Sequence, residues 1–209
     1  MKGKVSLREA PSNSTFLRRV WRPLLTWLAA GAGLLGAAFL IRPTASIVAA
    51  EPTKTAPEYR LRMFHTHTLE RIDVVYRRGD SYIPEAITRL DEFLRDHRTG
   101  DVHAYDPKLF DLLTALESEI GRPGAEIDVI CGYRTPWSNA FLRQHSSGVA
   151  PHSLHMQAEA IDIRIPGIST LALRNAALAL HLGGVGYYPL SDFVHVDVGR
   201  VRQWSLGVR

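Results

Sequence analysis

Two apolar segments of this chain each contain an ionisable side chain that the core of a protein does not tolerate without a partner. Asp162 lies within Ala160-Ile-Asp-Ile-Arg-Ile165, and His195 lies within Phe193-Val-His-Val-Asp-Val198. Both segments are short apolar runs of the kind that form strands. We therefore expect the fold to supply Asp162 and His195 with a partner, and a shared cation would satisfy both.

A third donor, His155, precedes Asp162 by seven residues, where a predicted loop meets a strand. Two histidines and one carboxylate bind a zinc ion and leave its fourth position open for water, which is the ligand count of a catalytic site. A spare carboxylate, Asp192, lies three residues before His195 and is available to take a proton from that water. These residues together suggest a zinc-dependent peptidase.

The same residues also have a purely structural interpretation. Asp162 then pairs with Arg134 or Arg164, and the two histidines are core residues with their own hydrogen bonds. A histidine and an aspartate seven residues apart occur by chance in many proteins. Spacing alone leaves both interpretations open.

Other potential metal donors are weaker candidates. His65 and His67 flank one residue at the end of a predicted strand and could face the same way, but exposed turn or edge-strand histidines explain them better. Cys131 is the single cysteine, which excludes an intramolecular disulfide and a cluster of zinc thiolates. Its apolar neighbours favour a small buried side chain over a nucleophile.

The formal net charge of +4 comes from the N-terminal end of the chain. Residues 1–50 contain seven Lys or Arg and one acid, which leaves 18 basic and 20 acidic residues in 51–209. The part of the chain with the candidate site is therefore mildly acidic, and a nucleic-acid partner is not expected.

Residues 24–40 are uncharged and rich in Leu, Ala and Gly, follow three arginines, and precede the small residues 48–50. This order is typical of an export signal. We predict a signal peptide or N-terminal membrane anchor over 1–50, a linker over 51–58, and one domain over 59–209. The domain is expected to be exported to the periplasm or cell envelope.

Periodicity within the domain predicts an α+β fold, with a small antiparallel sheet that carries the zinc site and helices packed against it. Turn and cap residues such as Thr135-Pro136 mark the starts of helices. The expected strands are 59–65, 69–76, 126–131, 158–165, 183–188 and 193–198, and the expected helices are 84–97, 106–120, 135–143 and 169–180.

Several ordered motifs resemble the murein endopeptidase K family and, more broadly, the D-Ala-D-Ala-type zinc peptidases, which share a metal site with lysostaphin and the hedgehog signalling domain. The resemblance covers roughly residues 58–204. Its motifs are Cys131-Gly-Tyr-Arg-Thr-Pro136 with Asn139, Ser153-x-His155-x6-Asp162, Gly183-Gly-Val-Gly-Tyr187, and Phe193-Val-His-Val-Asp197 with Trp204. One departure is Ala158, where related sequences commonly carry glycine.

The resemblance implies that His155, Asp162 and His195 are zinc ligands, that Asp192 is the general base, and that Arg134 meets the substrate carbonyl or the developing oxyanion. It implies a peptidoglycan endopeptidase that hydrolyses stem-peptide cross-links. Two alternatives are a D,D-carboxypeptidase or dipeptidase of the same group, and an inactive, zinc-stabilised module that binds the cell wall.

Three further residues are candidates for supporting roles. Ser153 could bond a substrate or a ligand, or simply stabilise a turn, and His152 could contact substrate or remain an exposed loop residue. Asp197 could orient a ligand histidine or pair with a nearby arginine. We expect a monomer whose partners are peptidoglycan stem peptides.

Overall fold

The computed structural model describes residues 55–146 and 148–207. The predicted leader, residues 1–50, lies outside this part of the chain. Within it, no helix has the length and apolar character needed to cross a membrane. The strands are β1 (Glu58–His65), β2 (Arg71–Arg78), β3 (Ser81–Tyr82), β4 (Glu126–Cys131), β5 (Ala160–Arg164), β6 (Gly184–Tyr188), β7 (Phe193–Asp197) and β8 (Arg202–Ser205). The helices are α1 (Pro84–Phe93), α2 (Lys108–Glu119), α3 (Pro136–His145), the 3-10 helix η1 (Leu154–Gln157) and α4 (Thr170–Leu180).

These strands form a single sheet in the order β3-β2-β1-β4-β5-β7-β6-β8. Strands β1 and β4 are parallel, as are β6 and β8, and the other neighbours are antiparallel. The predicted α+β class is confirmed. The sheet is larger than expected and mixed, because the N-terminal hairpin β1–β2 joins the strands of the site through the parallel pair β1–β4.

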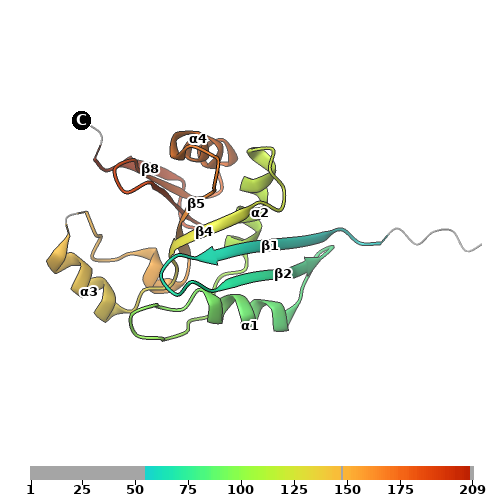
Figure 1. The fold of residues 1–209 in the computed structure, drawn as a ribbon, viewed down its shortest axis with the longest axis horizontal. Helices are drawn as coiled ribbons and strands as arrows, with labels where there is room; N and C mark the ends of the chain where they lie inside the picture. The colour runs from blue at the N-terminus through green and yellow to red at the C-terminus, as the bar shows by residue number, and fades with distance from the viewer. Residues whose placement is uncertain (1–54, 147, 208–209) are drawn as a thin grey trace, which may run out of the picture. The chain divides into compact units, whose positions relative to one another are not determined.

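Three helices bury the sheet. Helix α1 packs against β2, α2 against β1 and α4, and α4 against β6 and β7. Helix α3 lies apart from these three and projects beside the chain that leads into η1 (Figure 1). Its start was predicted correctly: the Thr135 side chain caps it by accepting a hydrogen bond from the Ser138 N–H.

The register of the strands places one row of residues across the sheet. Cys131 of β4 lies opposite Asp162 of β5, and Asp162 lies opposite His195 of β7. His195 lies opposite Gly186 of β6, which in turn lies opposite Trp204 of β8. Neighbouring strands are about 4.8 Å apart, so this row brings side chains from distant parts of the sequence together.

One buried acid in the helical layer is incompletely paired. Glu117 of α2 is 2% exposed, and one of its oxygens accepts a hydrogen bond of 2.8 Å from the Gly124 N–H. The other oxygen has no partner among the described residues. Burial raises the pKa of Glu117 to about 7.

This raised pKa predicts a pH-dependent effect of Glu117→Gln. Below about pH 4.5 the wild-type carboxyl is protonated in both folded and unfolded chains, so the two proteins should have similar stability. As the pH rises from about 4.5 to 7, the carboxyl ionises in the unfolded wild type but stays protonated in the folded protein, so the free energy of unfolding falls across this range and levels off above pH 7. Urea unfolding at pH 8 should therefore show the variant about 3 kcal/mol more stable.

Glu119→Gln is the matched control, since Glu119 is exposed on the same helix. It should change stability little at either pH. A Glu117→Gln effect that is equal at pH 4.5 and pH 8 would contradict the raised pKa.

Candidate metal centre

Three buried side chains from η1, β5 and β7 converge on one point. His155 Nε2 lies 3.2 Å from Asp162 Oδ1 and 3.1 Å from His195 Nδ1. His195 Nδ1 lies 2.9 Å from the same Asp162 oxygen. The sequence predicted these three residues as a set, and the structure brings their donor atoms together.

The outer hydrogen bonds of the two rings determine which nitrogen of each ring faces this point. His155 Nδ1 lies 2.8 Å from the Gly132 carbonyl oxygen, which can only accept, so Nδ1 carries the proton. His195 Nε2 lies 3.0 Å from Asp197 Oδ2, and an ionised carboxylate also only accepts. The inward-facing nitrogens of the neutral rings therefore both carry lone pairs.

Three acceptor atoms that face one another in a buried site require a cation between them. Without a metal, a proton meets this need: burial opposes the charged forms, but the ion pair with Asp162 raises the pKa of His155, and the histidines hold the pKa of Asp162 well below its usual range. Two imidazole nitrogens and one carboxylate oxygen are also a donor set that zinc accepts with one position left open. The residues present thus fit zinc.

Asp197 holds His195 in this orientation. It is fully buried, and its two oxygens also accept hydrogen bonds from the backbone N–H groups of Gly184 and Gly199 and from the Arg202 guanidinium. Burial alone would raise the pKa of Asp197, but His195 and these donors keep that pKa well below its usual range. Asp197 is therefore ionised and orients the His195 ring. It also pairs with Arg202, so both roles considered from the sequence are present.

Trp204 covers the other side of His195. The two ring centroids are 5.1 Å apart. The indole reaches His195 by lying across Gly186, where an added Cβ would come within 2.6 Å of the Trp204 ring. The glycine of the Gly-Val-Gly-Tyr motif thus gives Trp204 access to the site.

Arg134 is buried beside the donors at the end of β4. Its Nη2 lies 3.7 Å from Asp162 Oδ2, and Nη1 donates to Asn139 Oδ1 at 3.3 Å. Asn139 is held in turn by the Ala150 carbonyl oxygen. The Arg134 backbone N–H also donates to the His155 carbonyl oxygen. The Asp162–Arg134 pair considered in the structural interpretation therefore forms, but it uses the carboxylate oxygen that the histidines leave free.

Cys131 lies close to the donors, which its apolar neighbours in the sequence did not predict. Its Sγ lies near donor atoms of His155 and Asp162, all within 4.8 Å of one another, and accepts a hydrogen bond from Arg134 Nη2 at 3.3 Å. Burial raises the pKa of the thiol, but the positive charges of His155 and Arg134 lower it overall. A second possible donor set therefore includes Cys131. We favour the set with His195, because its donor atoms lie closer together and Asp197 orients its ring.

The donors lie in a cleft whose walls include several residues that the sequence singled out. Ser153 and His152 line it, Ser153 buried and His152 exposed. Tyr188 and Trp204 also line the cleft and are joined by a hydrogen bond from the indole N–H to the Tyr188 hydroxyl.

Asp192 is not brought together with the donors. It lies in the turn before β7 with a left-handed backbone (φ 53°), its side chain is 66% exposed, and Oδ2 lies 3.7 Å from Arg164 Nη1. Its predicted role as a base therefore requires movement of this side chain.

Ala158 ends η1 in a left-handed conformation, with φ 53° and ψ 37°. This backbone region favours glycine, and alanine there costs about 1 kcal/mol. The Ala158 methyl is fully buried in the core, which offsets a similar amount. With alanine at this position, His155 Nε2 and Asp162 Oδ1 on either side lie 3.2 Å apart.

His65 and His67 do not form the metal pair that their spacing allowed. His65 is buried, and its Nδ1 accepts hydrogen bonds from the backbone N–H groups of His67 and Thr68, which shapes the turn after β1. His67 is exposed and lines the same cleft as the donors.

Comparisons with known proteins show the family that the chain resembles. A family model described as peptidoglycan L,D-endopeptidase MepK matches residues 53–204. A Haemophilus influenzae protein named "Probable peptidoglycan L,D-endopeptidase MepK" is 38% identical over 180 residues, which cover 86% of this chain and 94% of that protein. The Escherichia coli K12 protein named "Peptidoglycan L,D-endopeptidase MepK" is 40% identical over 178 residues, which cover 85% of this chain and 94% of that protein. No solved structure matches the chain.

The role of Asp197 predicts that Asp197→Asn weakens zinc binding. An asparagine of the same shape no longer supplies a charged acceptor to His195, and such partners typically contribute 10- to 100-fold to metal affinity. Competition with a chromophoric chelator should show a loss of about that size. Asp73→Asn is the control, because Asp73 pairs with Arg60 on the exposed surface of β2. Unchanged zinc affinity in Asp197→Asn would contradict the orienting role.

Proposed function

The chain belongs to the peptidoglycan L,D-endopeptidase MepK family, and we propose that it hydrolyses peptide cross-links of peptidoglycan with a zinc ion held by His155, Asp162 and His195. The observation that carries the proposal is the set of three acceptor atoms that face one another at 2.9–3.2 Å. Relatives named for a peptidoglycan substrate imply that this peptidase acts in the cell envelope. Export through the predicted leader is part of the same proposal.

A bound zinc ion lowers the pKa of water toward neutrality and polarises a carbonyl oxygen. The protein must then stabilise the negative charge that develops when the scissile carbonyl is attacked. Arg134 is suited to this role, because its guanidinium is permanently charged, buried beside Asp162, and held by Asn139.

We assign proton transfer to Asp192, which would accept a proton from the attacking water and return it to the leaving amine. The carboxylate must first leave Arg164. That ion pair is long and largely exposed, so breaking it costs no more than about 1 kcal/mol. Ser153 and His152 line the same cleft and are placed to contact the substrate peptide.

The first test is hydrolysis of cross-linked muropeptide dimers by the purified chain, with products identified by mass. We expect release of monomers, loss of that activity after treatment with a chelator, and recovery when zinc is returned. Release of only a terminal D-Ala would instead identify a carboxypeptidase. A protein that binds one zinc ion and cleaves no muropeptide would be a binding module.

The second test concerns Asp192. Asp192→Asn should lower kcat by about 10²- to 10⁴-fold, the usual contribution of a general base, with zinc content unchanged. Asp73→Asn again serves as the control. An Asp192→Asn protein with wild-type kcat would mean that another group takes the proton.

A further inference from the structure

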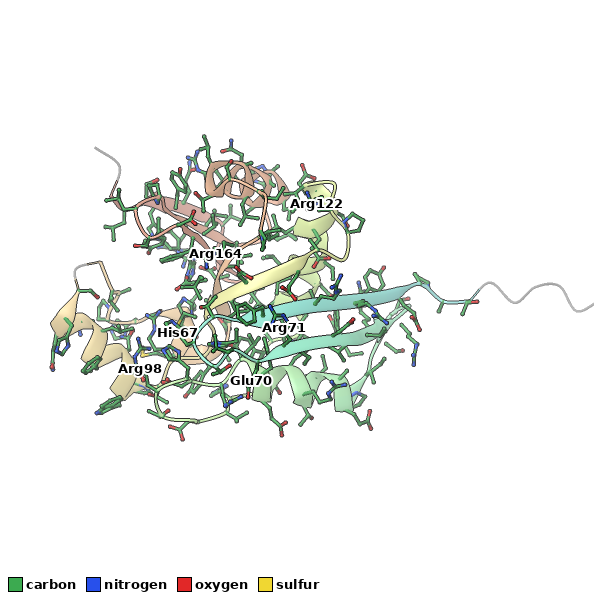
Figure 2. The ribbon with its side chains drawn as sticks, viewed as in Figure 1. His67, Glu70, Arg71, Arg98, Arg122 and Arg164 are labelled. Carbon is green, nitrogen blue, oxygen red and sulfur yellow. The ribbon has the colours of Figure 1, made fainter. Side chains whose placement is uncertain are left out.

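The cleft extends beyond the three donors to a cluster that the mechanism does not use. His67, His97 and Arg98 line its wall on the side of β1, along with Ile130 and Cys131 at the end of β4. His67 and Arg98 lie near each other between the sheet and α3 (Figure 2). We propose that His67, His97 and Arg98 form a subsite that binds a free carboxylate of the substrate peptide. The proposal rests on the proposed function, since it names a specificity site within the same cleft.

The strand order explains how this cluster comes to lie beside the donors. Strands β1 and β4 run in parallel with His65 opposite Val129, so both end at the same edge. The Thr66 N–H continues the pairing by donating to the Val129 carbonyl oxygen. His67 therefore lies next to the end of β4, two strand spacings, or about 10 Å, from Asp162 on β5. That distance corresponds to roughly three residues of an extended peptide.

His67 and His97 form a stacked, uncharged pair. Their rings are stacked, with centroids 4.1 Å apart and planes 10° from parallel. Burial and the neighbouring charges lower the pKa of His97 to about 4, and they also lower the pKa of His67. At neutral pH both rings are thus uncharged. Stacked rings cannot direct their lone pairs at a common point, which argues against a second metal site here.

Arg98 provides the positive charge of the subsite. The turn that carries it is held by Asp96, a buried residue whose carboxylate accepts hydrogen bonds from the Arg98 N–H and from the backbone and side chain of Thr135. Thr135 follows Arg134 in the chain, so the turn is tied to the catalytic motif. The buried Asp96 carboxylate therefore holds the turn from which Arg98 reaches the cleft.

The charge balance of the cleft favours an anion. Of the three arginines that line it, Arg134 pairs with Asp162 and Arg202 pairs with Asp197. Arg98 makes no ion pair within the part of the chain that the structure describes. Asp162 is the one carboxylate among the lining residues described, and the proposed metal occupies it. An unpaired guanidinium beside two uncharged imidazole rings matches a carboxylate, which peptide substrates supply.

Equilibrium binding to the full chain depleted of metal with a chelator tests the subsite apart from catalysis. The probes are a cross-linked muropeptide dimer and derivatives in which one free carboxylate at a time is amidated. We expect one amidation to weaken binding by about 10-fold, the effect of losing a charged hydrogen bond. Arg98→Gln should weaken binding of the free acid by a similar factor and remove its preference over that amide.

Arg122→Gln is the matched control, because Arg122 is also an exposed arginine but lies at the far end of the molecule, near α2 (Figure 2). It should preserve the preference. Three results would overturn the proposal. The wild type could bind the acid and all its amides equally, or bind neither, or Arg98→Gln could keep the preference for the acid.

The ratio of kcat/KM for acid and amide, measured with the zinc-loaded enzyme, separates the two proposals. A binding preference without hydrolysis would contradict the proposed function and leave the subsite standing. Hydrolysis of both peptides at equal kcat/KM, together with equal binding, would contradict the subsite alone.

Discussion

The hydrogen bond between His195 and Asp197 determines which nitrogen of that ring faces the cleft, and the rest of the site depends on it. With the outer nitrogen protonated, Nδ1 presents a lone pair toward His155 and Asp162. The buried carboxylate of Asp197 is itself held by Arg202 and by two backbone N–H groups. Strand β7 therefore supplies both the inward-facing donor and the residue that orients it.

The need of Asp162 and His195 for a partner was predictable from local chemistry. Asp162 and His195 each interrupt an apolar strand, and a buried ionisable group requires a partner wherever its strand packs. The outcome also shows why the structural interpretation remained open. Asp162 has two oxygens, and one faces the histidines while the other faces Arg134. Both interpretations identified real contacts of the same carboxylate.

The features of the site that were not predicted depend on contacts between residues far apart in the chain, which periodicity does not reveal. The helix expected over 84–97 ends at Phe93, since Asp96 is drawn into hydrogen bonds with Thr135. The turn that results carries His97 and Arg98 to the cleft. Cys131 reaches the donors through its register with Asp162, although its apolar neighbours suggested only a buried side chain. The exposed position of Asp192 likewise follows from the turn before β7.

The row that begins at Cys131 ends at Trp204 on β8, the last strand described. Every donor atom of the proposed zinc site precedes this strand in the chain. As the polypeptide emerges from the ribosome or from an export channel, His155, Asp162 and His195 therefore appear before the indole that covers His195. A chain arrested before β8 would hold the complete donor set but leave one side of His195 bare. The indole that lies across Gly186 is thus the last part of the site to be synthesised.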